Sequence, residues 1–484
     1  MISDGIIPSN EGRGYVLRRI IRRAARNGKL LGISHEFLTD VCDVVIRENV
    51  AGYSELGEKA AYIKKVLANE EDRFNATIDA GLSILSNLVR STIKEGANVI
   101  SGEDAFKLYD TFGFPLDLTK EIAEESHLEI DEAKFKELMQ AQKVRAREAR
   151  ENISGWSDAS KSLLAELPKT EFTGYTDYKT DAKIIAILAE DESVQSVSEG
   201  ECEVILDKTP FYGEGGGQVG DTGTIYKDGA VLTVYDTKKT DGVYVHLCTV
   251  ASGIFKVGDS VTADIDDARR DAVKRNHSAC HLLQAALRRV LGSHVEQAGS
   301  YVDNERCRFD FTHFSALTSD ELKKVEALVN AHILAANEIV TKETDIDTAR
   351  KEGAMALFGE KYGKTVRMVK MGDFSTELCG GTHCANTSNI GLFKIISESS
   401  VAAGVRRIEA VTGLGVIRLI EDSDKLISDT AKALKANNTA DMPQRAVSLQ
   451  NEISAQKKEI DELNRKIAGM KLETLISDAK VSGA

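Results

Sequence analysis

The sequence contains no apolar run of the roughly eighteen residues that a membrane-spanning helix needs, so we expect no such helix. Its first eight residues lack the basic n-region and the long apolar core of a signal peptide. Cysteines are few, and their number, seven, is odd, which argues against a disulfide framework and favours a reducing cytoplasm. Basic residues are fewer than acidic ones, 62 against 76. The net charge of −14 argues against indiscriminate nucleic-acid binding, although a local basic patch can still attract phosphates.

The 484 residues are enough for about three domains, and the residue pattern predicts a multidomain α+β protein. Residues 1–165 show the three- and four-residue apolar spacing of helices. Residues 166–262 contain short β-type runs separated by Gly and Asp, which predicts a small β-barrel or an antiparallel sheet. Residues 263–412 alternate helical and strand patterns. Residues 413–484 are helical and carry about three apolar heptads, which fit a coiled coil, a helical hairpin or a packed helix.

Two short segments carry soft or borderline metal ligands four residues apart, His277-Ser-Ala-Cys-His281 and Cys379-Gly-Gly-Thr-His383. In a helix, the first pair of imidazoles lies on one face, about one turn apart. The two glycines of the second segment, Gly380 and Gly381, allow a tight backbone turn that lets its ligands converge. One Cys and three His residues make a tetrahedral zinc set, and we predict that they bind one zinc ion. The alternative is two unrelated pairs.

A basic segment stands out against the acidic whole. Seven basic residues and no acidic residue occur between positions 13 and 29: Arg13, Arg18, Arg19, Arg22, Arg23, Arg26 and Lys29. Apolar residues recur at helical spacing among them, so the segment is predicted to be an amphipathic helix. A solvated helix face is one interpretation, but exposed helices normally mix charges of both signs. Because Arg suits bidentate phosphate contacts, the segment favours contact with nucleic acid.

Two other sequence patterns bear on which reaction the chain could catalyse and on where a ligand could bind. Zinc proteases with this histidine spacing require Glu after the first His as a general base, and Ser278 stands there instead. A zinc protease is therefore not expected. The glycine-dense segment 211–218 (FYGEGGGQ) fits either a tight turn between strands or a loop that lets a ligand approach the backbone closely.

Several motifs in order resemble those of bacterial alanyl-tRNA synthetases, over nearly the whole chain. Residues 8–24 (PSNEGRGYVLRRIIRRA) and 108–115 (LYDTFGFP) are similar to segments of that family's tRNA-recognition region. Residues 211–221 and 357–363 and both metal-ligand segments are similar to its editing domain. The resemblance implies a helical tRNA acceptor-stem domain at 1–165, a β-barrel at 166–262, a zinc-dependent editing domain at 263–412 and a helical linker at 413–484.

The resemblance also implies roles for single residues. Gln297 matches an editing-site position, and we expect it to contact the hydroxyl of a serine substrate. Cys280 is expected to line the same pocket. Asn10 and Asp110 match residues that read the G3·U70 pair of tRNA(Ala), and a short amide and carboxylate suit the minor groove of A-form RNA. The arginine helix would then hold phosphates and set the register.

One departure from the family changes the expected activity. The N-terminal aminoacylation domain, with its motifs for ATP and alanine, and the final globular domain are not matched, so we do not expect this chain to form alanyl-adenylate. The expected reaction is hydrolysis of Ser-tRNA(Ala) and Gly-tRNA(Ala), because a single binding pocket separates such small analogues only modestly. The alternatives are a non-catalytic, zinc-stabilised RNA-binding module and an inert truncation product. Self-association through the C-terminal helix is a further expectation.

Overall fold

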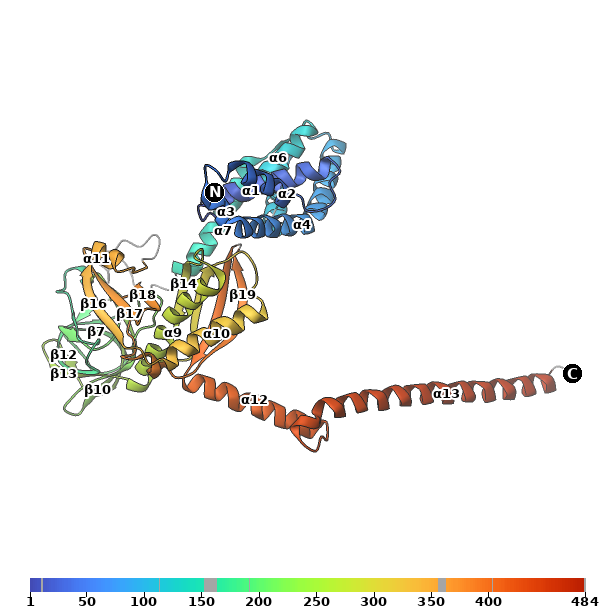
Figure 1. The fold of residues 1–484 in the computed structure, drawn as a ribbon. Coiled ribbons are helices and arrows are strands. Elements are labelled where there is room, and N and C mark those ends of the chain that lie inside the picture. Colours follow the sequence, from blue (N-terminus) through green and yellow to red (C-terminus); the bar gives the residue numbers. More distant parts are fainter. Residues whose placement is uncertain are drawn as a thin grey trace. The chain divides into compact units, whose positions relative to one another are not determined.

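The computed structural model describes residues 1–9, 12–112, 114–151, 163–190, 192–355, 363–402 and 404–482 (Figure 1). The chain forms two compact units, Met1–Gly413 and Leu414–Ala484. Both helices and sheets are present, which confirms the predicted α+β class. None of the helices in the described ranges combines the length and the apolar character needed to cross a membrane.

The N-terminal part of the first unit is helical, as predicted. Its core contains Leu17, Phe74, Ile78 and Leu85, which are almost fully buried where the helices pack. A two-residue parallel pairing of β1 (Val99–Ile100) with β2 (Glu129–Ile130) joins two of the loops. The helices are α1 (Gly12–Leu30), α2 (Leu38–Asn49), α3 (Ser54–Glu58), α4 (Ala60–Lys94), α5 (Gly102–Phe112), α6 (Leu116–Glu125) and α7 (Glu132–Glu151).

A closed six-stranded barrel follows, and it confirms the predicted small β-barrel. Its strands are β4 (Lys179–Ala189), β7 (Glu201–Leu206), β9 (Gly223–Lys227), β10 (Ala230–Thr240), β11 (Val243–Ser252) and β13 (Ser260–Ile265). They are hydrogen-bonded in the order β13-β9-β10-β11-β7-β4, and antiparallel pairing of β13 with β4 closes the ring. Short strands at its margin are β3 (Glu171–Phe172), β5 (Glu192–Val194), β6 (Ser196–Val197), β8 (Lys208–Thr209) and β12 (Phe255–Lys256). The barrel matters for function because the loop between β8 and β9 reaches the candidate site.

The last part of the first unit consists of two antiparallel sheets and two long helices. The larger sheet has the order β14-β15-β20-β19, and the smaller has the order β16-β17-β18. The strands are β14 (Gln297–Val302), β15 (Cys307–Thr312), β16 (Ile339–Asp345), β17 (Thr365–Met371), β18 (Ser375–Leu378), β19 (Phe393–Ala402) and β20 (Val405–Thr412). The helices are α9 (Asp267–Leu291), α10 (Ser319–Leu334), α11 (Ile346–Lys351) and the 3-10 turn η1 (Thr387–Ile390).

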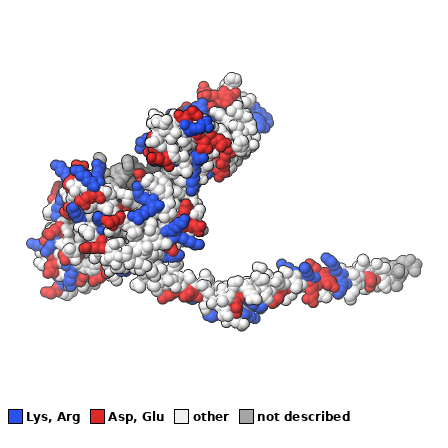
Figure 2. Space-filling model, viewed as in Figure 1, with Lys and Arg blue, Asp and Glu red and all other residues white. Residues whose placement is uncertain are grey.

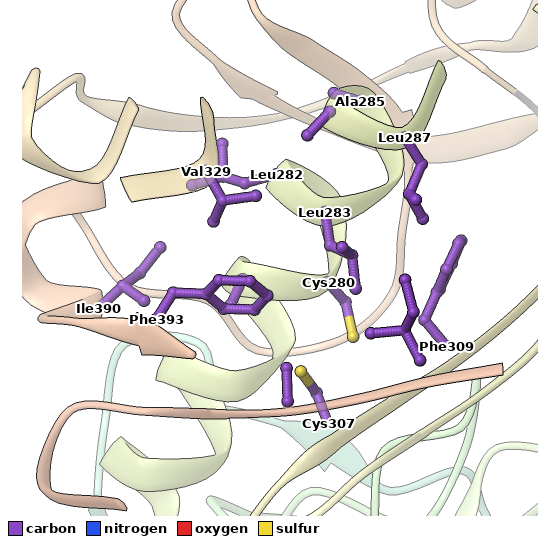
Figure 3. Close-up of a cluster of buried hydrophobic side chains, with 14 of the residues drawn as sticks. Cys280, Leu282, Leu283, Ala285, Leu287, Cys307, Phe309, Val329, Ile390 and Phe393 are labelled. Carbon is purple, nitrogen blue, oxygen red and sulfur yellow. The ribbon is translucent and has the colours of Figure 1, made fainter. Parts of the chain in front are cut away.

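Helix α9 lies at the centre of this part. It begins at Asp266, whose side chain accepts a hydrogen bond from the backbone N–H of Arg269 (2.9 Å), and it ends at Gly292, whose φ of 120° suits glycine. Leu282 and Leu283 are fully buried in the core beside Val329 of α10 and Phe309 of β15. Figure 3 shows this packing. The buried leucines fix the rotation of the helix, so that its other face presents the predicted metal ligands.

The second unit contains α12 (Leu414–Ala433), the 3-10 turn η2 (Thr439–Asp441) and the single long helix α13 (Met442–Ser482). Five apolar residues at the predicted heptad positions of α13 are about half exposed: Ile453, Ile460, Leu463, Ile467 and Met470. This stripe is the predicted coiled-coil face, and its pairing remains a prediction.

Candidate metal centre and its pocket

The four predicted ligands come together although about a hundred residues separate the two pairs. His277 and His281 lie on α9, and Cys379 and His383 lie in the loop that follows β18. One ligand atom from each residue lies within 4.8 Å of the others. The Nε2 atoms of His277 and His383 are each 3.4 Å from Cys379 Sγ. One thiolate and three imidazoles at this spacing are a donor set that a tetrahedral metal ion accepts.

Each imidazole is held through its other nitrogen. His277 Nδ1 is 2.8 Å from Gln218 Oε1, His281 Nδ1 is 2.5 Å from Glu377 Oε2, and His383 Nδ1 is 3.3 Å from Ser278 Oγ. These contacts leave the Nε2 atoms directed at the shared centre. Fixing the ring orientation in this way is the usual role of outer-shell partners at metal sites.

An orphaned polar atom supports a metal at this centre. His281 Nε2 is buried and has no hydrogen-bond partner among the residues that the structure describes. Since Glu377 occupies the opposite nitrogen, the free energy lost by burying Nε2 is recovered only if something binds there. A metal ion fits this requirement.

Gln218 joins the two halves of the centre, and sequence reasoning missed it. Its Oε1 accepts from the backbone N–H of Thr382 (2.9 Å) as well as contacting His277, and its Nε2 donates to Thr382 Oγ1 (2.9 Å). At Gly381 an added Cβ would lie 2.0 Å from His277 Cε1, so the backbone approaches the ring as only glycine allows. An added Cβ at Gly380 would meet nothing within 4 Å, so close packing requires glycine at 381 and not at 380.

Charge in the centre favours the thiolate. Burial alone would raise the pKa of the Cys379 thiol, but His277, His383 and His281 hold it well below its ordinary value. Burial lowers the pKa of His383 to about 3, so this imidazole is neutral. A thiolate and neutral imidazoles are the protonation states that bind a metal ion. His281 differs, because burial opposes its charge but the carboxylate of Glu377 outweighs burial and raises its pKa well above the ordinary value, so a metal ion that binds its Nε2 must displace a proton.

A cavity of about 460 Å³ opens beside the centre. His277, His281 and Cys379 line it, and so do Gln297 and Cys280, the two residues predicted for the pocket. The lining also includes Tyr175, Lys239, Gln284, Arg288, Ser300, Val302, Phe309 and three glycines of the 211–218 loop, Gly213, Gly215 and Gly216. The loop therefore forms a turn between strands and also part of the pocket wall, and close approach of a ligand to it remains a prediction.

The two predicted pocket residues differ in character. Gln297 begins β14, is partly exposed, and donates from Nε2 to Ser300 Oγ at 3.1 Å. Cys280 is 5 % exposed, and its thiol is directed at Cys307 in the core, as Figure 3 shows. The contact with Cys307, together with burial, raises the pKa of Cys280 well above the ordinary value. Cys280 is thus a neutral wall residue and not a nucleophile.

The arginine helix, α1, contains the basic segment 13–29, and several of its arginines are paired with acidic residues of other helices. Arg18 is 8 % exposed and pairs with Glu70 of α4 (3.1 Å), which also binds Arg22 at 2.7 Å. Arg26 is 4 % exposed and pairs with Glu125 of α6 at 2.9 Å. The prediction that the arginine helix presents its basic residues to phosphates is corrected for Arg18 and Arg26, because acidic residues of other helices cover them.

Two other arginines of α1, Arg19 and Arg23, are exposed but also form ion pairs. Arg19 pairs with Asp117 at 2.9 Å and Arg23 with Glu121 at 3.2 Å, with the two guanidinium-bearing side chains 47 % and 65 % exposed. Figure 2 shows basic and acidic side chains interleaved on the visible face of the N-terminal helices. Arg13 is exposed at the start of α1. Exposed pairs of this kind are weak, so Arg19 and Arg23 can exchange partners with a phosphate.

The remaining predicted tRNA contacts are only partly visible. Asp110 lies exposed near the end of α5. Asn10 lies outside the described residues, and so does most of the 357–363 segment. All seven cysteines lie in the described part of the chain and are free thiols, in agreement with the absence of a disulfide framework.

Comparison with known proteins gives the family context. The family model described as "tRNA synthetases class II (A)" matches residues 1–269, and that described as "Threonyl and Alanyl tRNA synthetase second additional domain" matches residues 366–409. The chain is 52 % identical over 483 residues to the alanine–tRNA ligase of Acetivibrio thermocellus, which covers 99 % of this chain and 55 % of that protein. It is 49 % identical over 485 residues to the alanine–tRNA ligase of Clostridioides difficile, with the same coverage. The chain spans about half the length of the curated relatives it matches.

Proposed function

Since the chain belongs to the class II (A) tRNA synthetase family, we propose that its pocket hydrolyses the ester bond of mischarged tRNA(Ala). The observation that supports this most is the cavity of about 460 Å³ lined by three of the four candidate metal ligands. A purely structural metal site needs no adjoining cavity. The proposed substrates are Ser-tRNA(Ala) and Gly-tRNA(Ala), whose amino acids resemble alanine too closely for one pocket to separate them well.

We propose zinc as the resident ion, held by His277, His281, Cys379 and His383. A thiolate with three imidazoles suits zinc, and carboxylate- and amide-held histidines are typical of its sites. When bound, zinc would supply Lewis-acid polarisation or positioning at the aminoacyl end of the substrate.

Other residues of the pocket are proposed to bind the aminoacyl group, the ribose and the terminal nucleotide of the substrate. Gln297 and Ser300, which are linked by a 3.1 Å hydrogen bond, offer a donor and an acceptor to the aminoacyl group. The glycines at 213, 215 and 216 let the ribose end of the substrate approach the backbone. Tyr175 and Lys239 on the lining present an aromatic face and a cation, which suit the terminal nucleotide of an RNA.

We further propose that the helical region binds the acceptor stem of tRNA(Ala). Arg13, Arg19 and Arg23 have exposed side chains that suit phosphates, and Asp110 and Asn10 are the proposed minor-groove readers. Arg18 and Arg22 are assigned a supporting role, because their ion pairs with Glu70 fix α1 on α4. The free thiols suit a reducing compartment, which makes the cytoplasm the proposed location.

The second candidate is a non-catalytic RNA-binding module in which the metal only stabilises the fold. It is favoured by the four protein donors, which complete a tetrahedron and leave no open position. The two candidates differ in whether ester hydrolysis depends on the centre.

The test is incubation of the purified chain with Ser-tRNA(Ala), Gly-tRNA(Ala) and Ala-tRNA(Ala). The proposal predicts rapid loss of the first two esters, slow loss of the third, and loss of activity in Cys379→Ala. Cys42→Ala, a buried cysteine of α2 outside the centre, is the matched control and should retain activity. Binding without hydrolysis supports the non-catalytic module, and a fully active Cys379→Ala variant contradicts the role of the centre.

A further inference from the structure

Helix α9 presents a third polar residue to the pocket, Gln284. Residues of α9 line the pocket over three turns, with Cys280 and His281 one turn before Gln284 and Arg288 one turn after it. Gln284 is 5 % exposed, so its amide lies almost wholly inside the protein. Side chains three and four residues apart on a helix have Cβ atoms about 5–6 Å apart, which places Gln284 next to the metal ligand His281.

The Gln284 amide makes no hydrogen bond to the described residues, and its polar atoms face the cavity instead of being sealed from it. A ligand that displaces water from this amide must replace the hydrogen bonds of that water, so the site favours a ligand with a polar group there. Two charged groups nearby are already engaged. Arg288 Nη1 donates to the carbonyl of Val295 at 2.5 Å, and Glu377 holds His281.

The surroundings of Gln284 suit a small side chain with one polar group. Val302 and Phe309 line the same cavity and are each 1 % exposed, so they supply an apolar wall. An amide both donates and accepts hydrogen bonds, and a hydroxyl does the same, so the two are complementary.

We infer that Gln284 binds the side-chain hydroxyl of the aminoacyl group and is a specificity-determining residue of the pocket. The inference rests on the proposed deacylation and extends it, because it separates Ser-tRNA(Ala) from Gly-tRNA(Ala) within that reaction. Gln284 acts on a hydroxyl that glycine lacks. Its removal therefore affects one substrate and spares the other.

The test is Gln284→Met, which keeps the length of the side chain and removes both hydrogen-bonding groups. We expect kcat/KM for Ser-tRNA(Ala) to fall about 3- to 10-fold, the loss of one uncharged hydrogen bond, with Gly-tRNA(Ala) unchanged. Zinc content should stay at the wild-type level. Gln450→Met, at an exposed position of α13, is the matched control and should change neither rate.

The outcomes separate this inference from the proposed function. If the wild-type chain hydrolyses neither ester, the proposed function fails and the inference falls with it. If the wild type is active but Gln284→Met leaves the Ser-to-Gly ratio unchanged, or lowers both rates equally, only the inference is overturned. Gln284→Asn, which withdraws the amide by one methylene, serves if the Met variant does not fold, and it should lower the same ratio.

Discussion

Replacing Glu377 with Gln should weaken metal binding while leaving the protein folded. The carboxylate lies 2.5 Å from His281 Nδ1, and both side chains are about nine-tenths buried. Because Gln has the same shape and its carbonyl still accepts from Nδ1–H, the variant removes charge and little else. Loss of an outer-shell partner typically lowers metal affinity about 10- to 100-fold. That range corresponds to about 1.4–2.7 kcal/mol of binding free energy.

The assay is a competitive titration of zinc against a chromophoric chelator, with the wild type and the variant in parallel. Glu459→Gln, at an exposed position of α13, changes the net charge equally and is the matched control. We expect its affinity to equal that of the wild type. An affinity of Glu377→Gln within twofold of the wild type would show that the carboxylate does not strengthen His281 as a ligand, and the argument from outer-shell geometry would be refuted.

Three further predictions follow from single contacts. Gly381→Ala should lose zinc, because its Cβ would lie 2.0 Å from an imidazole carbon of the centre, whereas Gly380→Ala, which meets nothing within 4 Å, should keep it; metal analysis decides. Burial lowers the pKa of His246 from 6.5 to about 4, so the neutral ring stabilises the barrel above pH 6.5, and about 3 kcal/mol is lost as pH falls towards 4. Denaturant unfolding of His246→Gln should lack this loss, and an identical pH profile contradicts it. Glu70→Gln should lower the free energy of unfolding by about 3–5 kcal/mol, because it leaves buried guanidinium groups without their carboxylate. Glu121→Gln, which removes the partner of the exposed Arg23, should lower it by under about 1 kcal/mol, and equal values for the two variants would refute the buried pairing.

Most elements of the fold follow from local patterns in the sequence. In strand β10, for example, more and less buried residues alternate from Ala230 to Tyr235, which is the two-residue period of a half-buried strand. Strand β9, which is needed to close the barrel, could not be predicted from alternation, because Ile225 is the single buried residue among its five.

The four candidate metal ligands could be selected from the sequence because their chemistry is specific and their spacing is short, and the structure brings them together. Their outer partners could not, since Gln218 and Glu377 become relevant only when the fold brings them to the imidazoles. The same limit explains the arginine helix. The sequence around Arg18 contains no acidic residue between positions 13 and 29, but Glu70 lies 52 residues further along the chain and pairs with Arg18 in the fold.

If the metal centre takes part in ester hydrolysis, removal of the metal must abolish the reaction. The chain would be stripped with a chelator, checked for retained helix content by circular dichroism, and assayed on Ser-tRNA(Ala) during stepwise addition of zinc. We expect no hydrolysis without metal and full recovery at about one zinc ion per chain, the capacity of the one four-ligand cluster in the described residues. Equal hydrolysis by the folded, metal-free chain would contradict it.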